Sequence, residues 1–232
     1  MSDMTGLPAA AWKLLTTGDS DTWSAIFTSL QVSLFATGLG ALIGVPAGLV
    51  IGSRTFKGKS ALTVLLHTLL SVPTVVVGLV LYLMFTRNGI LGDLDLMFTP
   101  TLMVIAETLL ILPMIIVFTA TSVSPLAAEV LETTASLGAG RWRSGWTLLG
   151  EARLGVLAAI VAGFGRAISE VGAALMLGGN IRGHTRTMTT SIALEASQGE
   201  FALGLALALI LMLIAFSINL VFYSLQQQTR TV

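Results

Sequence analysis

The sequence predicts an all-α integral membrane protein with about five transmembrane helices. Of the 232 residues, 54% are hydrophobic and only 10% are charged, whereas a soluble domain carries charge on roughly a quarter of its residues. The mean hydropathy is +0.89. Four runs have no acidic or basic side chain apart from His67, and each exceeds the roughly 20 residues that cross a bilayer. They are residues 22–53, 60–86, 108–128 and 201–229.

These runs place four helices, and a further apolar stretch supplies the fifth. Residues 155–178 are interrupted only by Arg166 and Glu170, so this stretch is also long and apolar enough to span the membrane. The third span extends back to residue 101, which brings Glu107 into the membrane. We therefore expect helices at about 26–51, 62–85, 101–120, 155–178 and 203–225.

Small residues mark one face of the first predicted helix. Gly40, Gly44, Gly48 and Gly52 recur at every fourth position. This spacing lines up small residues on one side of a helix and allows another helix to approach closely. We therefore expect this face to be a packing surface.

The distribution of Lys and Arg indicates the orientation in the membrane. With five spans, an outer N-terminus places seven of these residues in the cytoplasm and four outside, as the positive-inside rule favours. The inner set is Arg54, Lys57, Lys59, Arg141, Arg143, Arg153 and Arg230, and the outer set is Lys13, Arg87, Arg182 and Arg186. We expect a multi-pass inner-membrane protein with its C-terminus in the cytoplasm. Residues 1–20 show no pattern of a cleaved signal.

Composition also argues against several kinds of ligand. Twelve Lys and Arg residues balance twelve Asp and Glu residues, so no basic surface for nucleic acid is expected. The chain has no Cys, which excludes disulfides and thiolate metal sites. A single His in a polar loop does not make a metal site, and we expect no bound metal.

The loop between the third and fourth spans, residues 124–153, predicts two short amphipathic helices. Ser124-Pro125 is a helix-start pattern and Gly138 a stop. The first helix would place Leu126, Val130, Thr134 and Leu137 on one stripe, and the second would align Trp142, Trp146 and Leu149. Two interpretations remain open. The helices lie on the lipid surface, which suits Trp and Arg, or they dock a soluble partner.

Within this loop the sequence resembles a known family. The segment Glu132-Thr133-Thr134-Ala135-Ser136-Leu137-Gly138-Ala139, followed by Trp142, is similar to the EAA loop of permease subunits of binding-protein-dependent ABC importers. Thr133 and Thr134 replace two alanines of that pattern, and Gly150-Glu151 replaces its usual Leu-Pro. The resemblance implies that Glu132, Thr133, Thr134, Leu137, Gly138, Ala139 and Trp142 couple the chain to a separate ATPase subunit.

Two later segments, residues 163–173 and 178–190, are similar to permeases for molybdate and tungstate, with Met188-Thr189-Thr190 more like the tungstate branch. The resemblance implies a type I ABC importer permease fold in one transmembrane domain, residues 1–232, with a core at about 24–228. It implies import of tungstate or molybdate, two ATPase subunits that hold ATP and Mg²⁺, and a periplasmic or lipid-anchored oxyanion-binding protein. The chain itself would be neither an enzyme nor a cofactor carrier.

A five-span chain has too little surface to enclose a pathway, so we also expect a second copy in a homodimer. Two alternatives remain: a permease for another oxyanion or small solute, and an ion-coupled secondary transporter. In the second alternative, the charged residues of the spans would relay protons or ions.

Those charged residues are Arg166, Glu170 and Glu107. An ionised group near mid-bilayer is costly, so each must face protein or water. Arg166 and Glu170 are four residues apart and would share one face of a continuous helix. Either carboxylate is a possible partner for Arg166. The group would serve as a gate in the translocation pathway or as a salt bridge that locks two helices together.

The outer segment between the fourth and fifth spans gathers donors suited to an oxyanion. Guanidinium groups, hydroxyls and backbone N–H groups all donate to oxygen. The candidates are Asn180, Arg182, His184, Arg186, Thr187, Thr189 and Thr190. The segment would attract the anion, or it would simply form a loop that docks a binding protein.

Overall fold

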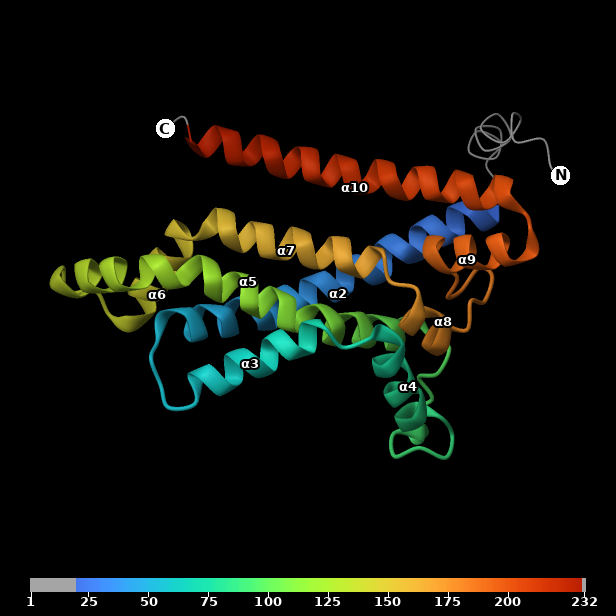
Figure 1. Cartoon of the computed structure of the whole chain (residues 1–232), viewed down its shortest axis with the longest axis horizontal. Coiled ribbons are helices and arrows are strands. Elements are labelled where there is room, and N and C mark those ends of the chain that lie inside the picture. The colour runs from blue at the N-terminus through green and yellow to red at the C-terminus, as the bar shows by residue number, and fades with distance from the viewer. Residues whose placement is uncertain (1–19, 231–232) are drawn as a thin grey trace. The chain divides into compact units, whose positions relative to one another are not determined.

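The computed structural model describes residues 20–230, and every regular element in that range is helical. This confirms the all-α prediction. The elements, labelled in Figure 1, are α2 (Ser20–Ser53), α3 (Lys59–Leu70), α4 (Thr74–Phe85), the 3-10 turn η1 (Gly92–Leu94), α5 (Pro100–Ser136), α6 (Arg141–Glu151), α7 (Arg153–Ile168), α8 (Gly172–Gly178), α9 (Met188–Gln198) and α10 (Phe201–Arg230). Lys13 and the signal prediction for the N-terminal segment lie outside the described residues.

Three helices of the described chain are long and apolar enough to cross a membrane, and the number rises to five if two bent helix pairs each count as one span. The three are α2, α5 and residues 203–220 of α10, and they confirm the first, third and fifth predicted spans. The bent pairs are α3 with α4 and α6 with α7. The prediction of about five spans is therefore the upper end of this range.

The second predicted span, residues 62–85, is wrong as a continuous helix. The chain breaks between α3 and α4, and Pro73 is the N-cap of α4 in extended conformation. Proline has no N–H to continue the hydrogen bonds of α3, and its ring pushes Val72 out of the helical region. The Val72 N–H instead closes a tighter turn on the Leu69 carbonyl at 3.3 Å.

The fourth predicted span, residues 155–178, is also divided. Helix α7 ends at Ile168 and α8 begins at Gly172. Glu170 lies in the break, where its Oε1 accepts a hydrogen bond from the Ala173 N–H at 3.1 Å and so satisfies a free donor at the start of α8. The expectation that Arg166 and Glu170 share one helix face is therefore wrong.

Helix α5 corrects the prediction that a new helix starts at Ser124-Pro125. It runs without interruption from Pro100 to Ser136 and contains Pro113 and Pro125. Buried residues on both sides of Pro125, namely Val123 and Ala127, belong to one apolar cluster. Pro125 removes one backbone hydrogen bond from α5, and the helix continues through a segment that is packed on both sides of this proline.

The glycine face of α2 packs closely against α5, as predicted. A Cβ atom added at Gly48 would lie 2.6 Å from the Cβ of Thr119, and one at Gly52 would lie 2.7 Å from the Ala120 carbonyl oxygen. Both distances are too short for real atoms. The two backbones therefore approach more closely than any larger residue at these positions would permit.

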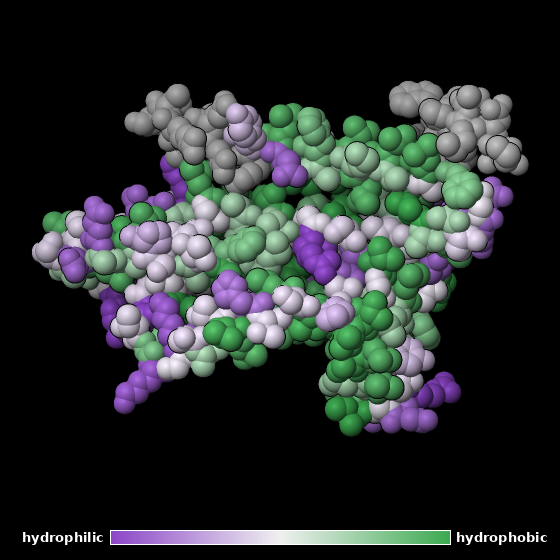
Figure 2. Space-filling model, in the orientation of Figure 1, coloured by the Kyte–Doolittle hydropathy of each residue, from purple (hydrophilic) through white to green (hydrophobic). Residues whose placement is uncertain are grey.

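The described chain forms two compact units. The first comprises residues 20–36, 73–107 and 167–219, and the second comprises residues 37–72, 108–166 and 220–230. Large apolar side chains are exposed on the first unit, including Val76, Leu79 and Leu83 on α4 and Met212 and Phe216 on α10. Figure 2 shows these surfaces as green areas over α4 and the middle of α10. Such surfaces suit contact with lipid acyl chains or with another apolar surface.

Candidate functional site

The EAA-like loop is built around a tight turn between α5 and α6. Gly138 has φ +74°, in the left-handed region that favours glycine. The Ala139 N–H donates to the Thr134 carbonyl at 2.9 Å, and the Gly138 N–H donates to the Ala135 carbonyl at 3.0 Å. These two bonds form the Schellman pattern that commonly ends a helix. They confirm the predicted helix stop at Gly138.

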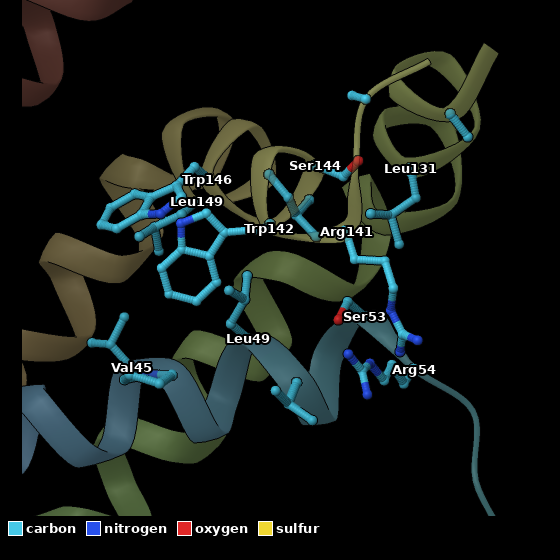
Figure 3. Close-up of a pocket in the computed structure, with 16 residues that line it drawn as sticks. Val45, Leu49, Ser53, Arg54, Leu131, Arg141, Trp142, Ser144, Trp146 and Leu149 are labelled. Atoms are coloured by element: carbon cyan, nitrogen blue, oxygen red, sulfur yellow. The ribbon is translucent and has the colours of Figure 1, made fainter. Parts of the chain in front are cut away.

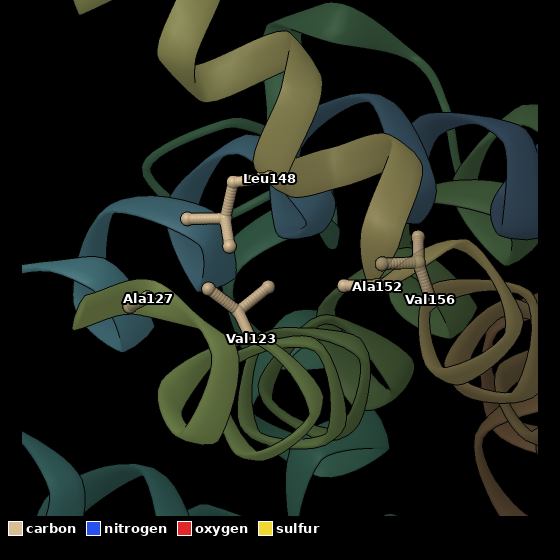
Figure 4. Close-up of a cluster of buried hydrophobic side chains, with 5 residues drawn as sticks. All are labelled: Val123, Ala127, Leu148, Ala152 and Val156. Carbon is tan, nitrogen blue, oxygen red and sulfur yellow. The ribbon is translucent and has the colours of Figure 1, made fainter. Parts of the chain in front are cut away.

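The inner side of the loop is anchored by an apolar cluster. Val123, Ala127, Leu148, Ala152 and Val156 are buried together, as Figure 4 shows, and come from α5, α6, the α6–α7 break and α7. Helices α6 and α7 are bent by 71° at the break between them. Because α6 packs on α5 through this cluster, the loop is held in a defined position by buried side chains.

A hydroxyl pair adds a polar link between the two sides of the turn. Thr134 Oγ1 lies 2.9 Å from Ser144 Oγ, and both side chains are buried. Thr134 occupies the position of an alanine in the EAA pattern. An alanine would have no group to bond with Ser144, so the threonine gives this chain a contact between α5 and α6 that the usual pattern lacks.

The outer side of the loop exposes an unusual set of side chains. Leu137 is 80% exposed and Trp142 is 79% exposed. The Trp142 and Trp146 rings pack edge to face with centroids 6.1 Å apart, a favourable aromatic geometry, and both are visible in Figure 3. Glu132 and Thr133 are also exposed. Of the predicted coupling residues, Thr134 faces the interior and Ala139 is half-buried, whereas the remaining five are exposed.

The two intramembrane carboxyl groups are both buried. Glu107, on α5, is 3% exposed, and its Oε2 accepts a hydrogen bond from Ser33 Oγ of α2 at 3.4 Å. Glu170 is 4% exposed. Its backbone carbonyl accepts a hydrogen bond from Thr189 Oγ1 at 2.6 Å, which ties the start of α9 to the α7–α8 break.

Arg166, in the last turn of α7, is half-buried and lines a cavity of about 220 Å³. The rest of the lining is apolar and comes from the end of α3, from Val72 and from α5: Leu69, Leu70, Val72, Leu110, Met114 and Phe118. A guanidinium group in such surroundings needs a charged or polar partner. The pairing of Arg166 with Glu107 or Glu170 stays a prediction.

The outer segment contains a helix that the sequence analysis missed. Thr187 caps α9 through a reciprocal pair of hydrogen bonds with Thr190, at 3.2 Å and 2.9 Å. The signal was present, because a threonine followed three residues later by a second hydrogen-bonding side chain is a capping pattern. Met188 also donates its N–H to Ser29 Oγ at 2.7 Å, which fixes this helix start against α2.

The candidate anion-facing residues separate into two groups. The hydroxyls of Thr187, Thr189 and Thr190 are buried and bonded within the protein, and Thr190 also donates to Asn180 Oδ1 at 2.9 Å. In contrast, Arg182 and His184 are exposed, and Arg182 lies 3.2 Å from Asp21 in a surface ion pair. Arg186 is half-buried and donates to the Asn180 carbonyl at 3.4 Å. Arg182 and His184 are therefore the members best placed to meet a solute.

Comparison with known proteins identifies the family. Residues 44–231 match the model of the binding-protein-dependent transport system inner membrane component. The tungstate uptake system permease TupB of Peptoclostridium acidaminophilum is 40% identical over 94% of this chain and 96% of its own. A probable anion ABC transporter permease of Haloferax volcanii is 37% identical over 82% and 84%. TupB of Campylobacter jejuni is 36% identical over 92% and 90%.

The matched region contains the Gly138 turn, the apolar cluster beneath it and the exposed face of Leu137 and Trp142. The apolar helices and the family match together make this chain a multi-pass protein of the inner membrane. The predicted resemblance to importer permeases is thus confirmed along most of the chain. The chain belongs to the family of inner membrane components of binding-protein-dependent transport systems, the permease subunits of ABC transporters.

Proposed function

We propose that this chain is the permease of an importer that carries tungstate, with molybdate as the other candidate, into the cytoplasm. The observation that carries the proposal is the 40% identity to a tungstate uptake permease across nearly the full length of both chains. A second relative named for tungstate is 36% identical over 92% of this chain. The similarity therefore includes both compact units and the loop between α5 and α6.

The same proposal assigns the exposed face of the loop to an ATPase subunit. Leu137 and Trp142 project from a turn that the buried cluster holds in place, so a partner that moves this face also moves α5 and α6. ATP and Mg²⁺ would be bound by that partner, and this chain would contribute no cofactor. Contact with a protein partner is favoured over contact with lipid because the family works with separate ATPase and binding-protein subunits.

The complete transporter would contain two copies of this chain, two ATPase subunits and an external oxyanion-binding protein. Large exposed apolar residues on α4 and α10 offer surface for lipid and for a second copy. The seven-to-four distribution of Lys and Arg supports an N-terminus outside and a cytoplasmic C-terminus. In this orientation the Gly138 turn faces the cytoplasm and Arg182 faces the binding protein.

Uptake of the two anions in the same cells tests the substrate assignment. Cells expressing the transporter should accumulate tungstate, and molybdate should compete more effectively than sulfate if the pathway accepts the larger oxyanions. Saturable import of an unrelated solute, with no import of either tungstate or molybdate, would contradict the proposal.

Replacing both Arg182 and Arg186 with Gln should slow uptake without changing which anion is preferred. The changes remove two positive charges near the outer mouth, an exposed one at Arg182 and a half-buried one at Arg186. An exposed charge acts within about 8 Å at physiological salt. A pathway that must release its passenger cannot hold it tightly, so selection is expected in the binding protein. Tungstate and molybdate rates should fall in similar proportion, and more at low ionic strength than at high.

Arg87→Gln is the matched control. Arg87, like Arg182, is exposed and is predicted to lie outside, but it belongs to another loop. It should have little effect. An altered tungstate-to-molybdate ratio in the double variant would place a selective site in this subunit. An unchanged rate would leave the segment as a docking surface for the binding protein.

A further inference from the structure

A cavity of about 510 Å³ lies between the end of α2 and the α5–α6 turn, entirely within one compact unit. Its walls come from the last three turns of α2, from the end of α5 and from α6, as Figure 3 shows. The volume is in the range of sites that hold small molecules. None of the candidate gate residues and none of the candidate residues of the outer segment lines this cavity. Of the predicted coupling residues, only Ala139 and Trp142 line it.

The chemistry of the cavity changes from one end to the other. Most of the wall is aliphatic, with Val45, Leu49, Leu131, Leu148 and Leu149 among the lining residues. The polar end carries Arg54, Arg141 and the hydroxyl of Ser53, which Figure 3 shows on the same side of the cavity. None of the lining residues, all of which belong to the described chain, is acidic. The cavity thus offers two positive charges with no carboxylate of its own to neutralise them.

The two arginines also lie at a defined position along the membrane helix. Residues 22–53 carry no charged side chain, and Arg54 is the first charged residue after them. The end of such an apolar run meets the interface between hydrocarbon and water. Trp142 and Trp146 line the same cavity, and Trp is enriched at the level of lipid headgroups. Arg54 therefore lies directly after the apolar run of α2, and the aliphatic wall of the cavity comes in part from the last turns of that run.

We propose that this cavity binds one anionic phospholipid. An acyl chain would lie along the aliphatic wall, and the phosphate would accept hydrogen bonds from the guanidinium groups of Arg54 and Arg141, which suit phosphate oxygens geometrically. Basic pockets between membrane helices are known to hold anionic headgroups. A zwitterionic lipid would bring an additional positive group towards the two arginines, so a net negative headgroup is preferred.

This inference does not depend on the transported substrate. The lipid would touch α2, α5 and α6 at once, so it would hold α6, and with it the exposed Trp pair, against the membrane helix. The membrane lipid would then act as a structural component of the loop that meets the partner. The competing occupants are a segment of a second copy and a segment of the ATPase.

Native mass spectrometry of the intact chain, purified with the partners it retains, tests the proposal. Titration with phosphatidylglycerol should give one tightly retained lipid, and phosphatidylcholine should be retained much less. The double variant Arg54→Gln, Arg141→Gln should lose about 25-fold in apparent affinity, the product of about fivefold for each arginine near a lipid headgroup. Arg143→Gln is the matched control, because Arg143 is exposed on the same helix but does not line the cavity.

A second variant fills the cavity and keeps both charges. Gly145 lines the cavity, and a Cβ added there meets only Leu49 Cδ2, at 3.9 Å. Gly145→Leu should therefore favour the helix, displace the acyl chain and abolish retention of the lipid. Gly150→Leu is its control, because Gly150 is on the same helix and outside the lining, and a Cβ atom added there meets nothing within 4 Å.

Three results would overturn the proposal. Equal retention of phosphatidylglycerol and phosphatidylcholine would show no charge selection. Unchanged retention in Gly145→Leu would show that the lipid binds elsewhere. The chain has no native Cys, so the variant Leu49→Cys carries one thiol that can be cross-linked in the membrane. Efficient linkage to a second copy or to the ATPase would identify a protein occupant. Failure of tungstate uptake would leave this result unaffected, because lipid retention is measured without transport.

Discussion

Glu132→Lys is expected to reduce transport to about a hundredth while leaving the protein inserted in the membrane. Glu132 is exposed near the end of α5 and makes no contribution to the buried cluster below it, so its replacement should not unfold the chain. In the proposed complex the side chain faces the ATPase, and a reversed charge at a packed contact costs several kcal/mol. We expect affinity for the ATPase and uptake to fall about a hundredfold, measured by co-purification and by transport.

Glu129→Lys is the control for charge reversal, because Glu129 is exposed on the same helix one turn earlier. A companion variant, Gly138→Trp, tests the turn itself. Gly138 has φ +74°, and a Cβ atom added there meets nothing within 4 Å. The tryptophan therefore strains the backbone and obstructs the docking face without entering the core. Normal co-purification of the ATPase with both Glu132→Lys and Gly138→Trp would show that the loop is not the docking site.

Arg166→Leu is expected to have the largest effect on stability. If Arg166 is paired with a carboxyl group inside the membrane, its removal leaves that group without a partner, and breaking a buried pair costs about 3–5 kcal/mol. The free energy of unfolding in detergent micelles measures the loss. Glu170→Gln and Glu107→Gln are the substitutions to combine with Arg166→Leu in double variants. Glutamine keeps the oxygen that accepts from the Ala173 N–H or from Ser33 Oγ and removes only the charge.

The two double variants identify the partner. If Arg166→Leu is combined with glutamine at the carboxyl group that pairs with Arg166, part of the lost stability should be recovered, because no charge is then left uncompensated. The same change combined with the other glutamine should recover nothing. If neither combination is more stable than Arg166→Leu alone, Arg166 is not held by these carboxyl groups and a direct role in the pathway becomes the better explanation.

The features that could be predicted from the sequence are those that depend on the composition and spacing of residues within one helix or one turn. Uncharged runs located α2, α5 and α10, and the glycine spacing located the surface of α2 that meets Thr119 and Ala120 on α5. Gly138 was also predicted correctly, because a left-handed turn between two apolar stripes has a local signature. Each of these signals is contained in neighbouring residues of the chain.

The errors occurred where tertiary packing decided the outcome. Pro73 lies in a helix break, whereas Pro125 lies inside α5, where Val123 and Ala127 are buried on either side of it. The sequence alone does not distinguish these two prolines. Likewise, the buried hydroxyl of Ser144 became visible as a partner of Thr134 only in the folded loop. The role of a buried polar side chain depends on partners that are distant in sequence, so it could not be predicted from the residues next to it.

Transport by the purified complex in liposomes tests the central claim most directly. The chain is reconstituted with its ATPase and binding protein, with no ion gradient across the membrane, and tungstate accumulation is measured with and without ATP on the side of the ATPase. We predict accumulation that requires ATP, requires the ATPase subunit and persists when the proton gradient is dissipated. Accumulation driven by a proton gradient without ATP would contradict the assignment and would indicate an ion-coupled transporter.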